Sequence, residues 1–220
     1  MTKTIKSDSN LTSALYRFDR SIIANGHGCI VGIDEAGRGP LAGPVIAAAV
    51  VLDLDKSIPG VNDSKKLSAR AREKLFPRIT REARSFAVGE ASVEEIDRLN
   101  ILQATLLAMR RALESISVPW TLALVDGNQP VRGVPESRQK TIVHGDGLSA
   151  SIAAASIIAK VTRDRIMKDY HLRFPMYDFL SNKGYGTAVH RRRIFDFGLC
   201  EHHRRTFCEK FVRQTRSSGS

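Results

Sequence analysis

The stretch CIVGIDEAGRGPLAGP, residues 29–44, decides the fold, because an apolar run ends there in two adjacent carboxylates and a glycine-rich turn. Residues 30–33 are typical of a buried strand, which places Asp34 and Glu35 where that strand leaves the core. Side chains alternate along a strand, so both acids can face one ligand only if the backbone bends, and the following glycines allow a bend. Taken alone, the pair fits a surface turn with two solvated acids or two carboxylates on one divalent cation.

Two further apolar strands end in an aspartate beside a glycine. Residues 120–125 predict a strand that runs into Asp126, and residues 141–143 predict one that runs through His144 towards Asp146. Acids at three strand ends would repel phosphate unless a metal ion lay between them. Four oxygen ligands in one cleft suit Mg²⁺ or Mn²⁺ rather than zinc.

The remaining segments predict an alternation of strands and helices. Residues 45–52 form an apolar run that indicates a buried strand, paired with the first strand as a hairpin. Residues 86–90 predict a further short strand. Apolar spacing and capping residues, such as Ser68 and Asn100, predict the helices. These helices span residues 15–23, 61–76, 93–99, 101–116, 149–167 and 188–197.

Composition restricts the partners. The 220 residues include 42% hydrophobic residues, which fits one soluble globular domain. The formal net charge is +11, which indicates a polyanionic partner such as nucleic acid or a membrane surface. Residues 171–220 hold ten Lys or Arg against four Asp or Glu, a net of +6. The charge is therefore concentrated near the C-terminus.

Three cysteines, at positions 29, 200 and 208, are an odd number without the spacing of a disulfide framework. Free thiols in a reducing compartment are expected, and the spacing around Cys200 and His203 fits no usual zinc pattern. The first ten residues are polar, and no stretch has the length of a signal peptide core or a membrane span. The expected location is the cytoplasm.

Several basic residues are candidates for phosphate contacts. Lys65 and Lys66 follow Asn62 and Ser64 into a helix, where they are either a solvated helix end or ligands for a phosphate. Lys160 and Arg163 lie about one turn apart near the end of a small-residue helix, where structural charge pairing with Asp164 is an equal alternative.

Seven ordered motifs give the chain a resemblance to bacterial ribonuclease HII over residues 28–212. The motifs are DEAGRGP (34–40), NDSKKLS (62–68), DGN (126–128), GD (145–146), SIAAASIIAKVTRD (151–164), KGYGT (183–187) and EHHRR (201–205). Single short motifs carry little weight, whereas seven in order are very improbable by chance. His144 departs from the pattern, since relatives often carry lysine there, so a phosphate contact at this position is in doubt.

The resemblance implies an α/β protein with a ribonuclease H-like fold, in which a central mixed five-stranded sheet is flanked by helices. It also implies a helical C-terminal extension. The expected organisation is a partly flexible N-terminal extension (1–27), a catalytic core (28–170), a basic helical region packed on the core (171–212) and a disordered tail (213–220).

By the same resemblance, Asp34, Glu35, Asp126 and Asp146 are the catalytic, metal-binding carboxylates. They would hold two Mg²⁺ or Mn²⁺ ions, with Asp34 between the two ions, Asp146 on the nucleophile side, and Glu35 and Asp126 towards the leaving group. The implied substrates are RNA–DNA hybrids and DNA duplexes with an embedded ribonucleotide, cut 5′ of the ribonucleotide to leave 3′-OH and 5′-phosphate ends by two-metal catalysis. A monomer is expected.

Selectivity for RNA requires a group that senses the 2′-hydroxyl. The resemblance assigns this contact to the backbone of Gly37, Arg38 and Gly39, and a glycine turn does allow main-chain groups to approach a ligand closely. It also implies that Tyr185 stacks on the next sugar. A half-buried loop aromatic is the alternative for Tyr185 without the motif.

Two rival functions remain. Another metal nuclease of the same fold, such as ribonuclease HIII or a junction nuclease, would share the carboxylates, and a substrate panel would separate it. A non-catalytic nucleic-acid-binding protein would explain the charge, but it has no need of acids at three strand ends.

Overall fold

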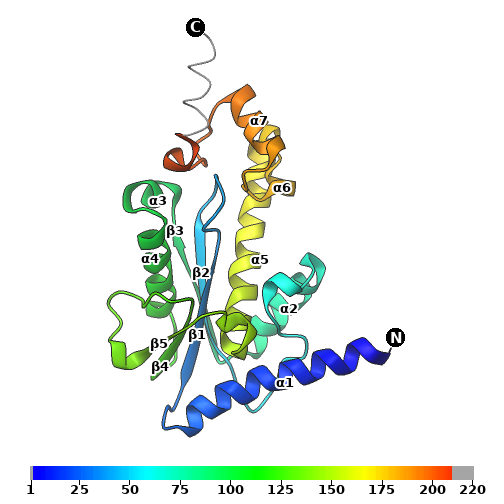
Figure 1. Ribbon diagram of the computed structural model, residues 1–220, viewed down its shortest axis with the longest axis vertical. Helices are drawn as coiled ribbons and strands as arrows, with labels where there is room; N and C mark the ends of the chain where they lie inside the picture. The colour runs from blue at the N-terminus through cyan, green and yellow to red at the C-terminus, as the bar shows by residue number, and fades with distance from the viewer. Residues whose placement is uncertain (1, 210–220) are drawn as a thin grey trace.

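A five-stranded sheet forms the centre of the computed structural model, which describes residues 2–209 (Figure 1). The tail expected at residues 213–220 lies outside the described residues. The strand order is β3-β2-β1-β4-β5. The strands are β1 (Ile30–Ala36), β2 (Val45–Val51), β3 (Ser85–Ala91), β4 (Leu122–Asp126) and β5 (Gln139–Ile142).

The sheet is mixed, as expected. Strand β1 pairs with β2 in an antiparallel hairpin, and β2 pairs with β3 in the same sense. On its other edge β1 is parallel to β4, which is parallel to β5. Because the carboxyl ends of parallel strands meet at one edge of a sheet, β1, β4 and the segment after β5 deliver their acids to one place.

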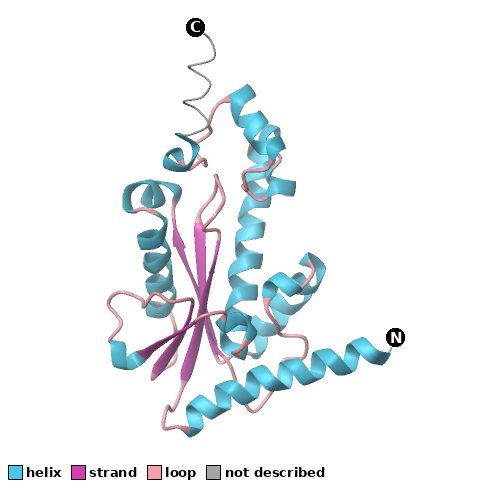
Figure 2. Cartoon of the chain, viewed as in Figure 1, coloured by secondary structure: helices cyan, strands magenta, loops and turns pink. Residues whose placement is uncertain are grey.

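Helices cover both faces of the sheet (Figure 2). Strand β2 is buried throughout, and its alternate residues belong to two separate cores. One core includes α1 (Thr2–Ala24), α2 (Ala69–Glu82) and α5 (Ala150–Arg173), whereas the other includes α3 (Val93–Leu99) and α4 (Ile101–Glu114). An apolar strand without alternation is what burial on both faces requires.

Helix α5 packs closely on β1. A Cβ atom added at Gly32 of β1 would collide with the backbone of Ser151, and this absence of a side chain lets the helix approach the strand. The alanines and serines early in α5 are buried on all sides. Close packing of this kind fixes α5, and every cleft residue on it, relative to the strand that carries Asp34.

The start of the chain differs from the expectation of a loose segment with a short helix at 15–23. Helix α1 runs from Thr2 to Ala24, and from Thr12 onward it contributes to the core. Leu15 and Tyr16 are buried, and the Tyr16 hydroxyl accepts the N–H of Ile58 at 3.0 Å. Asp19 accepts both the N–H and the hydroxyl of Ser151 at 2.8 Å. The sequence predicted the second half of this helix but not the first, because residues 2–13 are mainly polar.

Other boundaries moved less. Ser68 caps α2 by accepting the N–H of Ala71, and Asn100 caps α4. The segment before α2 is a separate 3₁₀ helix rather than part of the helix expected at 61–76. The short 3₁₀ helices are η1 (Ser64–Lys66), η2 (Glu136–Arg138), η3 (Gly145–Gly147) and η4 (Pro175–Tyr177).

The C-terminal region is helical and lies beyond the end of α5. It contains α6 (Phe179–Asn182) and α7 (Ala188–Phe197), which lie above the sheet in Figure 1. Residues 203–204 return to the loop after β1, where Ala42 and His203 form an isolated β-bridge. Within residues 2–209, no helix has the length and apolar character needed to cross a membrane.

Candidate active site

Four carboxylates occupy the carboxyl edge of the sheet, and we call them the acid edge: Asp34, Glu35, Asp126 and Asp146. Asp34 and Glu35 lie near the C-terminal end of β1. Asp126 is the last residue of β4, and Asp146 lies in η3 after β5. The chain turns at Gly37 (φ 102°), after β1 has ended, rather than between the two adjacent acids. Both acids nevertheless line the same cleft.

Few groups compensate the charge of the acid edge. Asp126 Oδ1 accepts the N–H of Gly145 at 2.7 Å, and Asp34 Oδ1 accepts the N–H of Glu35 at 2.7 Å. Lys65 Nζ lies 3.1 Å from Asp146 Oδ2. Each bond stabilises one carboxylate. The charge of Lys65 also acts on Asp34, although no salt bridge to Asp34 forms in the described part of the chain.

Burial and mutual repulsion act on the pKa values of these acids. Burial, and then the charges of Glu35 and Asp126, raise the pKa of Asp34 well above its ordinary value. Burial also raises the pKa of Glu35, which Arg38 opposes from 3.4 Å. For Asp126, burial and the charge of Asp146 raise the pKa. A cluster of this kind favours the arrival of positive charge.

The acid edge fits a metal ion held partly by substrate. Among residues 2–209, no three His, Cys, Asp or Glu side chains are close enough to form a complete metal cage. Mg²⁺ usually binds one or two carboxylates together with waters and substrate phosphates, and it seldom occupies a cage made by protein alone. Carboxylate oxygens spread along one edge of an open cleft suit that mode of binding.

The cleft has a volume of about 260 Å³ and brings together residues from five parts of the chain. Its lining residues are Asp34, Glu35, Ala36, Gly37, Arg38, Gly39, Ser64, Lys65, Arg72, Asp126, Ser156, Lys160 and Tyr185. Asp146 joins the cleft through its contact with Lys65.

Three of the expected substrate residues lie elsewhere. Asn62 and Lys66 line a neighbouring pocket. Arg163 is buried, and its guanidinium donates to the carbonyls of Pro44, Ala42 and Lys183 at 3.0–3.1 Å. All three of its nitrogens are thus bonded to backbone, so the phosphate contact expected of Arg163 is replaced by a bracing role.

The sequence interpretation missed Arg72 and Ser156 as cleft residues. Arg72 Nη1 donates to the carbonyls of Ser64 and Leu67 at 2.8 and 2.6 Å, which holds η1 against α2. The Ser156 hydroxyl lies 2.7 Å from that of Ser64. Ser156 had the right signal, a serine among alanines on a helix facing the strand, but that pattern also describes ordinary close packing.

The loop between β1 and β2, which we call the glycine loop (residues 37–44), is held from inside by a second buried arginine. Arg204 donates to the carbonyls of Arg38 and Pro40 at 2.9 Å, and to those of Gly37 and Gly43 at 2.5–2.9 Å. A Cβ at Gly37 would collide with the Arg163 side chain. Carbonyls turned towards arginine leave the opposite, cleft-facing side of the loop for a ligand.

Tyr185 borders the glycine loop and is 46% exposed. Its carbonyl lies 2.9 Å from His190 Nδ1, while His190 Nε2 lies 3.1 Å from His203 Nε2. The N–H of Cys200 donates to His203 Nδ1 at 3.0 Å. If both rings are neutral, only one pair of tautomers fits this series of hydrogen bonds. His203 Nε2–H donates to His190 Nε2, and His190 Nδ1–H donates to the Tyr185 carbonyl.

Burial, and then the neighbouring His190, lower the pKa of His203 to about 4, and burial lowers the pKa of His190. Both rings are therefore neutral near pH 7. These hydrogen bonds fix the backbone of Tyr185, whereas its ring lies in the cleft.

Comparison with known proteins agrees with this geometry. Residues 31–210 match the family model described as Ribonuclease HII. A ribonuclease HII of Syntrophotalea carbinolica is 56% identical over 195 residues, which cover 89% of this chain and 92% of that relative. The solved ribonuclease H2 of Pyrococcus horikoshii OT3 is similar with a TM-score of 0.69 and 26% identity, over 86% of this chain and 99% of that one.

A solved Bst-RNase HIII in complex with Mn²⁺ shares the fold, with a TM-score of 0.70, 19% identity, and coverage of 86% of this chain and 70% of that one. The expected fold is confirmed by these likenesses and by the mixed five-stranded sheet. The chain belongs to the ribonuclease HII family and is an endonuclease that hydrolyses RNA in RNA–DNA hybrids.

Proposed function

We propose that this endonuclease cuts the phosphodiester 5′ of a ribonucleotide, in hybrids and in DNA duplexes with a single embedded ribonucleotide, and leaves 3′-OH and 5′-phosphate ends. The observation that carries the proposal is the presence, in one cleft, of the acid edge and of the glycine loop with Tyr185. The first provides for hydrolysis, and the second provides for recognition of a sugar.

The acid edge would hold two divalent ions, Mg²⁺ or Mn²⁺. When bound, such ions activate a water and neutralise the departing oxygen. Asp34 is the natural residue between the two ions, because Glu35 and Asp126 are the charges that act on it. The Mn²⁺ in the related HIII structure supports a metal at this edge.

Lys65 has a further part in the proposal. Burial lowers the pKa of Lys65, but the hydrogen bond to Asp146 raises it. The net effect is a raised pKa. Its side chain is 75% exposed. The ammonium can therefore balance Asp146 before substrate arrives and contact a phosphate afterwards. Lys160, at the other side of the cleft, is bound to Asp164 at 2.7 Å.

Recognition of the ribonucleotide is assigned to the glycine loop and Tyr185. Because Arg204 and Arg163 bind the inward carbonyls, the loop is shaped before substrate binds. The 2′-hydroxyl would meet the backbone of Gly37, Arg38 and Gly39, and the Tyr185 ring would lie on the next sugar. Residues 171–209 would form the basic wall beyond Tyr185.

The test is cleavage of a DNA duplex with one ribonucleotide by the purified chain, with Mg²⁺ or with Mn²⁺. The expected products end in a 3′-OH deoxynucleotide and a 5′-phosphate ribonucleotide, identified by mass spectrometry. Cleavage of continuous hybrids without cleavage of this duplex would contradict the proposed specificity.

The remaining expectations stay predictions. Action as a monomer is one of them. Sedimentation would test that state, and fractionation of cells would test the expected cytoplasmic location.

A further inference from the structure

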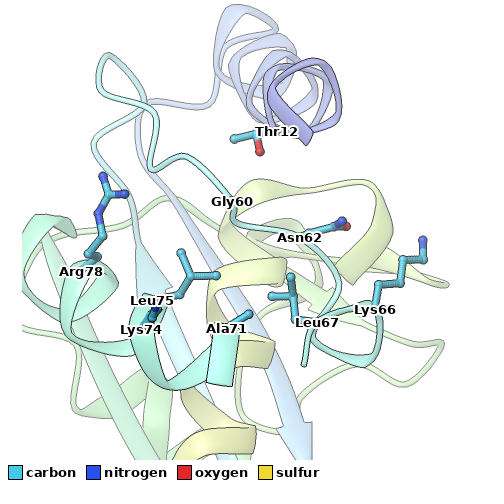
Figure 3. Close-up of a pocket in the computed structure, with 9 residues that line it drawn as sticks. All are labelled: Thr12, Gly60, Asn62, Lys66, Leu67, Ala71, Lys74, Leu75 and Arg78. Carbon is cyan, nitrogen blue, oxygen red and sulfur yellow. The ribbon is translucent and has the colours of Figure 1, made fainter. Parts of the chain in front are cut away.

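A second, larger pocket lies beside the cleft, between α1, the loop before η1, and α2 (Figure 3). Its volume is about 630 Å³, which is within the range of small-molecule sites. The residues that line it are Thr12, Gly60, Asn62, Lys66, Leu67, Ala71, Lys74, Leu75 and Arg78. The geometry of the cleft does not use this pocket.

The lining combines an apolar floor with cations at the rim. In Figure 3, Leu67 and Leu75 lie between Arg78 on one side and Lys66 on the other. Lys74 is the third cation, and no Asp or Glu is among the described residues that line the pocket. A ligand with an apolar face and at least one negative group matches this arrangement, whereas a neutral or cationic ligand does not.

The cations retain most of their capacity to bind an anion. Lys66 lies 3.8 Å from Asp63 with its side chain 62% exposed, and Arg78 Nε lies 3.3 Å from Glu82 with its side chain 40% exposed. Exposed pairs of this kind are weak, typically below about 1 kcal/mol. Among the described residues, no ion pair involves Lys74.

The pocket and the cleft share one wall. Ser64 and Lys65 of η1 line the cleft, whereas Lys66 of the same short helix lines the pocket. The two sides of α2 divide similarly, with Arg72 towards the cleft and Lys74 and Arg78 towards the pocket. A nucleic-acid strand that leaves the cleft over η1 would therefore meet Lys66 of the pocket next.

We propose that this pocket is a nucleotide subsite, in which the cations bind phosphate and the apolar floor takes a sugar or base. The proposal rests on the proposed function, since the strand held in the cleft is the nearest source of a nucleotide. A free nucleoside monophosphate has the same chemistry and is the other source. Lys74 and Arg78 are one turn apart on α2, which places their Cβ atoms about 5–6 Å apart. This spacing lets both side chains bind one nucleotide phosphate or two neighbouring ones.

The experiment uses the full chain with Lys74→Ala and Arg78→Ala combined, and Arg81→Ala as the matched control on the same helix. Arg81 is exposed and is not among the residues that line the pocket. Dissociation constants are measured for a short ribonucleotide-containing duplex that covers the cleft, and for the same duplex extended on either side by paired or unpaired nucleotides. Deoxyadenosine monophosphate is titrated separately by calorimetry.

We expect the extension on one side to strengthen binding by the wild-type chain and the control about tenfold. The double variant should lose this gain, with a salt dependence shallower by about one to two units, as for the loss of two phosphate contacts. The short duplex should bind all three proteins equally. Loss of monophosphate binding in the double variant would support the subsite with the free nucleotide as its source.

The proposal is overturned if the double variant binds every extended duplex and the monophosphate as the wild-type chain does. These binding assays are independent of cleavage. If the gain from the extension is present in the wild-type chain and lost in the double variant, but the wild-type chain fails to cut the single-ribonucleotide duplex, the proposed function is contradicted and the subsite is supported.

Discussion

The acid edge and the glycine loop lie on one cleft, but buried charge has a different effect in each. The acid edge consists of carboxylates, whereas the glycine loop is bound by two buried arginines. At the acid edge, carboxylates repel one another, and burial and this repulsion raise the pKa of Asp34. Behind the glycine loop, the guanidiniums of Arg163 and Arg204 are buried and donate hydrogen bonds to backbone carbonyl oxygens rather than to a carboxylate. Burial, and then the charge of Arg163, lower the pKa of Arg204 to about 9.

The difference separates the two functions of the cleft. Repulsion among the acids is unfavourable until a cation binds. The acid edge therefore lowers the stability of the folded protein, but it is suited to bind the metal ions that catalysis requires. The arginines satisfy many carbonyls of one turn, so the glycine loop gains a fixed shape before any ligand arrives. Substitutions on the two sides should therefore change activity and stability in different proportions.

The largest effect is expected from Asp34→Asn, which should lower turnover about a thousandfold or more because a metal ligand is lost. The same variant should unfold at a higher temperature near pH 7, with a gain of about 1–2 kcal/mol, because repulsion is removed. Since the pKa of Asp34 is raised in the folded state, its charge destabilises the protein as pH rises above its ordinary 3.8.

Thermal unfolding and single-turnover cleavage would measure both effects. Asp55→Asn, at an exposed loop position, is the control and should change neither. Loss of stability in Asp34→Asn would contradict the account of the acid edge as a repulsive cluster.

Arg204→Met should show the reverse proportion, with a loss of stability of about 3–5 kcal/mol, because several buried carbonyls lose their donor. Arg204→Lys should recover only part of it, since an ammonium lacks the planar fork. Urea unfolding measures the loss. Arg205→Met is the matched control, because Arg205 contacts Asp97 through its backbone N–H. Equal stability of the Arg204 and Arg205 variants would remove Arg204 from its bracing role.

The histidines behind Tyr185 predict a pH effect on the loop side of the cleft. The folded pKa of His203 is about 4 and its ordinary value is 6.5, so the unfolded chain binds the proton first. Stability should therefore fall as pH decreases from 6.5 to 4, by roughly 3 kcal/mol from this residue.

The groups that face His203 are His190, Cys200, Tyr177 and His202. Urea unfolding from pH 7 to pH 4 should give a smaller decrease for His203→Gln than for the wild-type chain. Identical pH dependences of the two proteins would show that the proton binds elsewhere.

The smallest effect is expected from the ring of Tyr185. Tyr185→Ala should lower cleavage of single-ribonucleotide duplexes about ten- to a hundredfold, the typical value of one stacked base or sugar contact. Continuous RNA–DNA hybrids should lose much less. Tyr185→Phe keeps the ring and should keep much of that preference, and Mn²⁺ binding should be unchanged in both. A ratio of the two substrates that is the same in wild-type and Tyr185→Ala protein would leave Tyr185 as an ordinary loop aromatic.

The sequence predicted the acid edge better than the glycine loop for a physical reason. An acid at the end of an apolar strand is a local signal, so Asp34 and Asp126 could be found from their neighbours. Arg163 and Arg204 bind carbonyls more than a hundred residues away. Every residue has a backbone carbonyl, so no sequence pattern shows which carbonyls an arginine will bind.

The way helix α1 is held in place was hidden for a related reason. Asp19 looks like a surface acid in the sequence, yet its carboxylate is buried against Ser151, 132 positions further along. The polar anchors of this fold are long-range, whereas the apolar periodicity that predicts helices and strands is short-range.

The contacts of Arg204 also determine when the enzyme can become active during its synthesis. A chain is made from its N-terminus, so the glycine loop leaves the ribosome long before Arg204, which is 160 positions beyond Pro44. Until then the loop carbonyls lack their guanidinium, and the cleft has one finished wall, the acid edge. Nuclease activity should therefore begin only after Arg204 has left the ribosome, and a nascent chain truncated before Arg204 should be inactive.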